Sequence, residues 1–325
     1  MYSWSDDMSD WRAPEAYKYS EETKKARDVE AERAEAAGPR TYTKKREPNM
    51  QIVTPKKDIV SHSPNPLVVA VDVTGSMQTW PAEIFDRLPL FFNTLSSYRP
   101  DLEVSFIAIG DAGCDQWPLQ VTDFAKGFDL EERLKALVGE GGGGDEPESY
   151  GLLAYYLRHH VRVPQAERPF LIIFGDATMH KRVPGKQIKH YLSDESAQDA
   201  DAITLFQEVS LDWNTWFLRR PSGRPGDKVE KQWSEAIGEQ QVVLMEDEQR
   251  AVDYAMGLVA RNWGFFGDFQ QNMRARQDDD KVKNLASKIE ATKPRLVRCP
   301  NCSAMLPPTA RGRISCSYCK ATVDA

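Results

Sequence analysis

The sequence predicts an α/β fold, with a doubly wound, mostly parallel sheet and a small cysteine-rich module at the C-terminus. Short apolar runs such as PLVVAV and FLIIF alternate with amphipathic stretches of helical length. The runs are apolar at almost every position, which is typical of parallel strands covered on both faces. Four of the five cysteines lie within the last 27 residues, in two CxxC pairs.

The expected elements alternate along the chain. Strands are predicted at 67–72, 102–110, 169–174, 215–219 and 241–245. Helices are predicted at 80–97, 130–138, 148–160, 185–192, 200–209, 229–237 and 248–263. Because sheets of this kind bind ligands at the carboxyl ends of their strands, the residues that follow Val71, Ile109 and Phe174 are the first candidates for a site.

Composition divides the chain into four parts. Residues 1–64 show no apolar periodicity and are expected to form a flexible N-terminal arm, in which 20–37 favours a polar helix that is either solvated or docked on a partner. The α/β domain is expected at 65–268. A charged, helix-compatible linker follows at 269–294, and the cysteine module occupies 295–325.

Charge and hydropathy exclude some classes of protein. The chain has 325 residues, a formal net charge of −7 and a mean hydropathy of −0.56, which argues against a body built as a basic nucleic-acid binder. Its apolar runs are far shorter than the roughly 20 residues of a membrane-spanning helix. The first residues, MYSWSDDMSD, are acidic where a secretory signal would be basic, so we expect a cytoplasmic protein.

Oxygen-bearing side chains follow two of the predicted strands. Asp72, Thr74 and Ser76 alternate directly after the first strand, and Asp176 follows the third. A glycine-rich loop between them carries Asp145 and can bring it to the same edge of the sheet. Carboxylates and hydroxyls are hard ligands that suit Mg²⁺ or another hard divalent cation. The alternative is that Asp72 and Asp176 only cap helices at the strand ends and that no ion binds.

These segments, in this order, resemble the metal-ion-dependent adhesion site of von Willebrand factor A (vWA) domains over residues 66–265. The DxSxS motif of that family matches Asp72, Thr74 and Ser76, with threonine in place of the first serine, and its last aspartate matches Asp176. Asp145 stands where the family usually has threonine. The resemblance implies a Rossmann-like fold, a Mg²⁺ site and binding of protein partners. Three carboxylates would leave the bound cation a poorer electrophile for an acidic ligand.

Three further residues are predicted at the rim of this site. Asp111 and Asp115 follow the second strand, and His180 lies four residues after Asp176. We expect them to border the site and not to bind the metal. A surface-loop role for His180 is the plainer interpretation.

An enzymatic alternative starts from the same first motif. The DVTGS sequence also resembles the DKTGT segment of the haloacid dehalogenase superfamily, in which Asp72 would be the nucleophile of a Mg²⁺-dependent, phosphate-handling enzyme. The second acid of that family is missing, because His180 occupies the fourth position after Asp176. The glycine run lacks the GK[ST] of a phosphate-binding loop. We therefore assign no catalytic residue and do not expect an enzyme.

The C-terminal cysteines predict a structural zinc site. Cys299, Cys302, Cys316 and Cys319 form two CxxC knuckles separated by thirteen residues, which resembles a zinc ribbon. A redox dithiol pair is the alternative. A module of about 30 residues is too small to fold on a core of its own, so the Zn²⁺ ion would supply folding energy.

The zinc module differs in charge from the rest of the chain. From Lys293, near the end of the linker, to the last residue there are six basic residues against one acidic residue, namely Lys293, Arg295, Arg298, Arg311, Arg313 and Lys320 against Asp324. Such a module could contact nucleic acid, an acidic protein surface or the acidic body of the same chain. Protein contact is preferred because only Tyr318 is available to stack on a base. The resemblance to intracellular vWA proteins implies an adaptor that binds protein partners in a multiprotein assembly through the vWA metal site.

Overall fold

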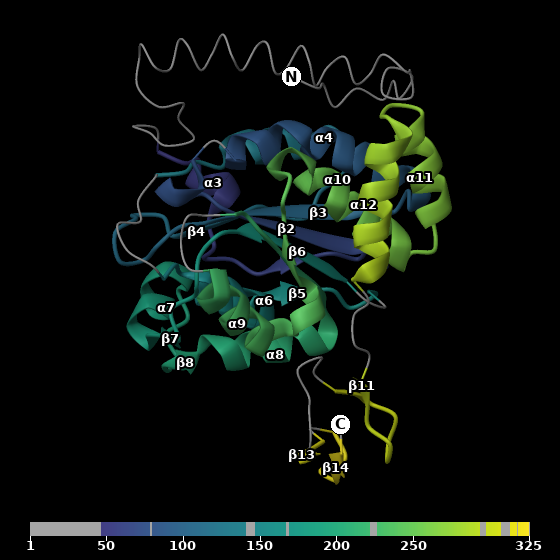
Figure 1. The fold of residues 1–325 in the computed structure, drawn as a ribbon. Coiled ribbons are helices and arrows are strands. Elements are labelled where there is room, and N and C mark those ends of the chain that lie inside the picture. Colours follow the sequence, from purple (N-terminus) through teal and green to yellow (C-terminus); the bar gives the residue numbers. More distant parts are fainter. Residues whose placement is uncertain are drawn as a thin grey trace.

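A computed structural model describes residues 47–78, 80–140, 147–166, 169–221, 226–292, 297–306, 313–316 and 318–324 (Figure 1). Residues 1–46 of the expected arm and the glycine-rich loop with Asp145 lie outside these ranges, as do the basic residues Lys293, Arg295 and Arg311. Within the described part of the chain, every helix is too short or too polar to cross a membrane.

A six-stranded sheet in the order β10-β9-β6-β2-β3-β4 forms the centre of the body. Its strands are β2 (Pro66–Asp72), β3 (Glu103–Ile109), β4 (Leu119–Val121), β6 (Phe170–Gly175), β9 (Asn214–Arg219) and β10 (Val242–Leu244). Only β4 is antiparallel to its neighbour; the other pairs are parallel. The predicted fold class is confirmed, and β4 is an addition that three residues were too few to reveal.

The strands form because both of their faces are buried. All seven residues of β2 are buried, as are all six of β6 and of β9. Side chains alternate along β2, so that Leu67 and Val69 join one core while Val68 and Ala70 join the other. This two-sided burial explains why the strands are apolar at almost every position.

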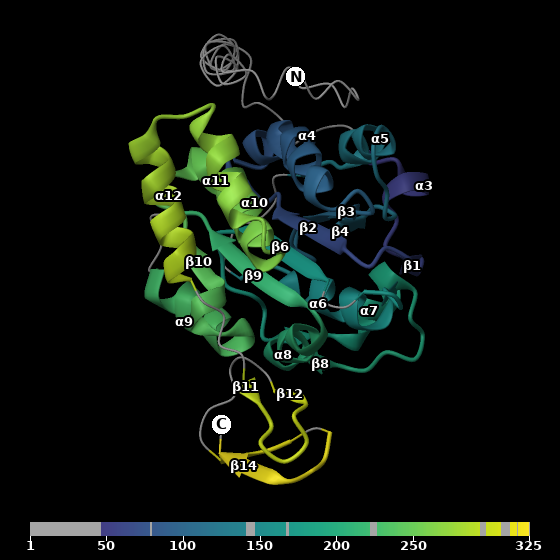
Figure 2. The same ribbon diagram turned by 90° about the vertical axis from the view of Figure 1, so that its right-hand side faces the viewer.

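Helices cover both faces of the sheet (Figure 1). One face carries α4 (Trp80–Tyr98), α5 (Asp129–Ala136), α10 (Ala251–Asn262), α11 (Phe266–Arg274) and α12 (Asp279–Ala291). The other carries α6 (Tyr150–His159), α7 (Gly185–Leu192), α8 (Ala202–Asp212) and α9 (Gly226–Ile237). Figure 2 shows α10 beside α4 above the sheet. Three-residue 3₁₀ turns lie at Gly75–Met77 (η2), Glu239–Gln241 (η3) and Glu248–Arg250 (η4).

The part of the expected arm that is described, residues 47–64, packs on the body. It forms α3 (Met50–Val53) and β1 (Ile59–Val60), and β1 pairs with β5 (Val161–Arg162). Val53 and Ile59 are buried in the two cores. These elements are two to four residues long, too short to show the periodicity on which the sequence-based boundary depended.

The expected linker also differs from what its charge suggested. It is helical as predicted, but the boundary after residue 268 falls inside α11, and α12 contributes to the core. Val282, Leu285 and Ile289 form a buried stripe on one face of α12. The segment therefore packs as part of the α/β body.

Four short strands build the C-terminal module, and another pair lies in the body. In the module, β11 (Val297–Arg298) pairs with β12 (Met305–Leu306), and β13 (Arg313–Ser315) pairs with β14 (Thr322–Asp324), both antiparallel. Cys299, Leu306, Cys316 and Val323 make a small core separate from the other two. In the body, β7 (Arg182–Val183) pairs with β8 (Ala200–Asp201).

Candidate metal sites

The first candidate site lies where the strand order of the sheet reverses. Numbered along the chain, the six strands follow the order 3-2-1-4-5-6, and such sheets bind ligands at the carboxyl ends of strands 1 and 4. Here these are β2, which ends in Asp72, and β6, which is followed by Asp176. The parallel pairing of β2 with β6 brings the two aspartates to one edge.

Four predicted residues meet at this edge through hydrogen bonds. The Thr74 hydroxyl donates to Asp72 Oδ1 at 2.6 Å, and the Thr74 N–H donates to the same oxygen at 2.9 Å. The Ser76 hydroxyl donates to Asp176 Oδ1 at 2.9 Å. Both aspartates are fully buried, whereas Ser76 is half-buried. The site is therefore built on rigid strand ends and opens toward solvent at Ser76.

These contacts leave hydroxyl lone pairs free for a cation. Thr74 and Ser76 each give their proton to a carboxylate, and their oxygens lie 3.4 Å apart. Neighbouring ligands of an octahedral Mg²⁺ are about 3 Å apart. The donor set fits a hard divalent cation that keeps several of its waters, and its role as a metal site stays a prediction.

Tyr150, which the sequence analysis did not single out, completes the surroundings of Asp72. Its hydroxyl donates to Asp72 Oδ2, on the opposite side from Thr74. The ring packs edge-to-face on Trp233 with centroids 5.0 Å apart. A side chain on Gly175 would collide with the Tyr150 hydroxyl, so this approach needs glycine at the end of β6.

Glu148 is a second residue that sequence reasoning missed. It precedes α6, and its carboxyl group is 1% exposed and close to Asp72 and Thr74. The sequence signal was weak, since Glu148 was only one of several acids in the loop and at the predicted start of a helix. A mutual approach of Glu148 and Asp72 depends on tertiary structure.

Burial and mutual repulsion make these carboxylates hard to ionise without a cation. Burial, together with the charge of Asp176, raises the pKa of Asp72 to about 7. Burial and the charge of Asp72 raise the pKa of Glu148 to about 9. A divalent cation would stabilise the ionised form of both groups, which is a further sign that the residues fit a metal.

The structure brings the three predicted rim residues together beside this site. His180 Nε2 lies 3.0 Å from Asp111 Oδ1, which also accepts from the Ser149 hydroxyl at 3.0 Å. Asp115 Oδ2 accepts from the N–H of Asp111 at 2.7 Å. Burial raises the pKa of Asp111, but the hydrogen bonds from His180, Gly113 and Ser149 outweigh it and the net shift is downward. The carboxylates of Asp111 and Asp115 therefore accept hydrogen bonds from groups around them.

Arg220 fixes the loop that carries Ser76. It follows β9 directly and donates from Nη1 to the Ser76 carbonyl at 2.8 Å, while Nε donates to Glu248 Oε2 at 3.0 Å. Nη2 donates to the Gln78 side chain at 3.3 Å, and Gln78 has a positive φ of 51°. Arg220 lies just past the carboxyl end of β9, so its place after a strand was the sequence signal that could have identified it.

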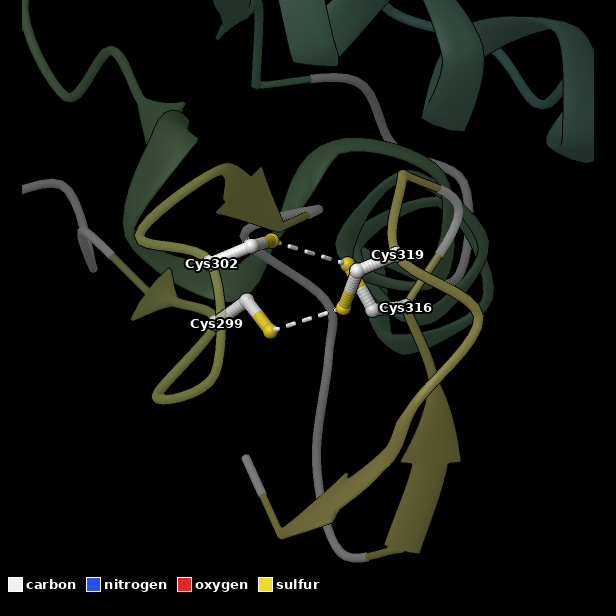
Figure 3. Close-up of side chains that lie close together, drawn as sticks. All are labelled: Cys299, Cys302, Cys316 and Cys319. Atoms are coloured by element: carbon white, nitrogen blue, oxygen red, sulfur yellow. Dashed lines mark hydrogen bonds between the residues drawn. The ribbon is translucent and has the colours of Figure 1, made fainter.

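The four predicted zinc ligands form the second candidate site. Their sulfur atoms all lie within 4.8 Å of one another, with Cys299 to Cys319 at 3.7 Å and Cys302 to Cys316 at 3.8 Å (Figure 3). A tetrahedral Zn²⁺ with Zn–S bonds of about 2.3 Å separates its sulfurs by about 3.8 Å. Within the described ranges, no other group of three or more His, Cys, Asp or Glu side chains converges this tightly.

The two knuckles repeat one backbone design. Ser303 and Lys320 each stand four residues after the first cysteine of a pair, and both have a positive φ near 60°. The N–H of each donates back to that cysteine's carbonyl, at 2.8 Å and 2.9 Å. The Asn301 amide and the Ala321 N–H lower the pKa of Cys319 to about 6, which favours the thiolate that a metal needs.

Comparison with known proteins finds no relative in sequence and only distant structural matches. No family model and no curated protein matches the chain. Similar solved structures include the pilus adhesin SpaC from Lactobacillus rhamnosus GG (11% identity, TM-score 0.42) and the vWF domain of the type V pili tip protein Mfa5 from Porphyromonas gingivalis (10%, 0.44). A von Willebrand factor type A structure from Catenulispora acidiphila is 17% identical, with a TM-score of 0.39.

Each match covers about two thirds of the chain. The match to SpaC covers 64% of this chain and 31% of SpaC, so the chain spans under a third of that protein. The match to Mfa5 covers 62% of this chain and 97% of the other. The match to the Catenulispora structure covers 62% of this chain and 43% of the other. The body has a vWA-like α/β fold, judged by its sheet order, its antiparallel edge strand and the position of its DxTxS motif. A C-terminal Cys₄ cluster consistent with a zinc site accompanies it.

Proposed function

We propose that this protein is an interaction protein that binds a protein partner through a divalent cation at the strand ends of its vWA-like body. Asp72, Thr74, Ser76 and Asp176 would hold the cation, which would offer a coordination position to the partner. Binding of proteins is the usual role of vWA domains, and the particular role of this one is our inference. Asp145 stays a predicted ligand outside the described residues.

One observation carries this proposal. The hydroxyls of Thr74 and Ser76 both donate their protons to aspartates. Their oxygens therefore have lone pairs free for a cation at the point where the strand order of the sheet reverses. If the aspartates only capped a helix, Ser76 would have no reason to reach across to Asp176, one hundred residues away. The half-buried position of Ser76 gives a partner access.

A binding role is favoured over the nucleophilic role of Asp72. Asp72 is fully buried, and its two carboxylate oxygens accept hydrogen bonds from Thr74 and Tyr150. A nucleophile needs an accessible oxygen in line with the substrate's phosphorus. The enzymatic alternative therefore has less support from the geometry than the binding role.

We further propose that the Cys₄ cluster holds a structural Zn²⁺. Four thiolates close the coordination sphere, and the separate core of the module is too small to fold by itself. The spacing of the sulfurs supports zinc over two disulfides, because bonded sulfurs lie about 2.05 Å apart. The zinc would fold the module and take no part in the chemistry of the vWA site.

The test is an affinity capture with the full-length, zinc-loaded chain in buffer with and without Mg²⁺. A partner that uses the site is captured by the wild type in Mg²⁺ and is lost without Mg²⁺ and in the double variant Asp72→Ala, Ser76→Ala. Glu208→Ala, on an exposed face of α8, is the matched control and should capture it normally. If every captured protein is indifferent to Mg²⁺ and to the double variant, the proposed function is wrong.

A further inference from the structure

The buried carboxyl group of Glu148 lacks a hydrogen-bond partner among the described residues. The residue is 1% exposed, and in the described part of the chain neither Oε1 nor Oε2 has a hydrogen-bond partner. The nearby Thr74 hydroxyl has one proton, which it gives to Asp72 at 2.6 Å. A buried polar group without a partner is costly, so its presence calls for an explanation.

The backbone of Glu148 is fixed from both sides. Its N–H donates to the Thr178 carbonyl at 2.9 Å, and its carbonyl accepts from the His180 N–H at 3.0 Å. The backbone N–H of the next residue, Ser149, donates to the Gly110 carbonyl at 3.3 Å. These bonds tie the start of α6 to the loops that follow β3 and β6. Any residue except proline can make the two backbone bonds of position 148, so they explain the position of Glu148 and not its carboxylate.

Three other acids act on Glu148. Besides burial, the charges of Asp72, Asp111 and Asp115 each raise the pKa of Glu148. Asp111 is supplied with donors by His180 and Ser149, so it needs nothing from Glu148. The carboxylate that lacks a partner is thus the one that adjoins Asp72 and Thr74, at the proposed cation site.

We propose that Glu148 is a further ligand of the divalent cation held by Asp72, Thr74, Ser76 and Asp176, either directly or through a cation-bound water. The inference rests on the proposed function, because it needs a cation at this site. A cation would supply a positive charge that balances the carboxylates of Asp72 and Glu148. A bound cation would also explain why Glu148 stands on a rigid segment close to the ligand Asp72.

The test measures Mn²⁺ binding to the full-length, zinc-loaded chain by the EPR signal of free Mn²⁺, with Mg²⁺ as competitor. The wild type should show one tight site that Mg²⁺ displaces, and Asp72→Asn should lose it. Glu148→Gln keeps the shape of the side chain and removes the charge, and should weaken Mn²⁺ binding about tenfold or more. Glu140→Gln is the matched control, since Glu140 has its own donors in the N–H groups of Gln116 and Trp117 and should bind as the wild type does.

The outcomes separate the two claims. If the wild type has no tight site, both the proposed metal site and the role of Glu148 are wrong. If the wild type binds Mn²⁺ and Asp72→Asn does not, but Glu148→Gln binds as tightly as the wild type, only the role of Glu148 is wrong. Circular dichroism and thermal unfolding without Mn²⁺ check the fold. Should Glu148→Gln fail to fold, Glu148→Asp, which shortens the reach of the carboxylate, must weaken binding for the inference to stand.

Discussion

Tyr150 donates its hydroxyl proton to Oδ2 of Asp72, which lies 78 residues earlier in the chain, and both side chains are completely buried. Thr74 occupies the other oxygen of the same carboxylate. Asp72 is thereby held in one orientation at the end of β2. The hydrogen bond links the helix on one face of the sheet to the loop that would bind the cation.

Replacing Tyr150 with phenylalanine tests this link. Tyr150→Phe keeps the ring against Trp233 but leaves a buried carboxylate oxygen without its donor, so the free energy of unfolding should fall by about 1–3 kcal/mol. Because Asp72 would also lose the hydrogen bond from Tyr150 that orients it, Mg²⁺ binding should weaken about tenfold. Urea unfolding and Mn²⁺ titration measure the two effects.

Tyr156 provides the matched control for that variant. It lies on the same helix and donates to the carbonyl of Lys57 at 2.7 Å, far from the carboxylates. Tyr156→Phe should cost about 1 kcal/mol and leave cation binding unchanged. Equal cation affinity in the two variants would contradict a role for Tyr150 in orienting Asp72.

Gly175 should be intolerant of the smallest side chain. In Gly175→Ala the new Cβ collides with the Tyr150 hydroxyl and lies 3.0 Å from the Phe217 ring, and such overpacking costs about 1–3 kcal/mol. Gly267→Ala on α11 meets nothing within 4 Å and should instead stabilise the protein by about 0.4–1 kcal/mol. Denaturant midpoints of the two variants should move in opposite directions, and a shift in the same direction would refute the steric argument.

Much of the fold was predictable because its strands are buried on both faces. β2 and β6 are apolar at nearly every position, and this pattern depends on the chain alone. The contribution of α12 could not be predicted in the same way. Its buried residues Val282, Leu285 and Ile289 stand in a sequence otherwise rich in charge, so composition indicated a linker where the structure has a packed helix.

The candidate site was predictable only where it follows directly from the strand ends. Asp72 and Asp176 are placed by the ends of β2 and β6, and the DxTxS spacing places the hydroxyls. Tyr150 and Glu148 reach the site because of how α6 docks on the sheet and because Gly175 leaves room. No spacing in the sequence encodes that docking, so these two residues required the three-dimensional structure.

A buried charge on α10 should matter more to stability than any surface ion pair. Asp253 has a side chain that is 1% exposed, pairs with Arg87 at 2.6 Å and accepts from Gln277 at 3.1 Å, and so joins α10 to α4 and to the turn before α12. Asp253→Ala leaves the mostly buried guanidinium of Arg87, whose side chain is 15% exposed, without its carboxylate and should cost about 3–5 kcal/mol. Glu208→Ala removes an exposed pair with Arg158 and should cost under about 1 kcal/mol. Comparable losses in urea unfolding would contradict this ranking.

The zinc site should be separable from the stability of the body. Among the described residues, Cys316 belongs to the core of its own module, which is separate from the two cores of the body. Cys316→Ser should therefore reduce bound zinc from one equivalent per chain to nearly none while the thermal unfolding of the α/β body stays unchanged. The zinc-free module should then become sensitive to protease, because its buried side chains are too few to keep it folded without the ion. Cys114→Ser changes the exposed thiol of the body and should keep one equivalent of zinc. Native mass spectrometry reads the zinc directly, and full zinc occupancy in Cys316→Ser would show that the four cysteines do not form the site.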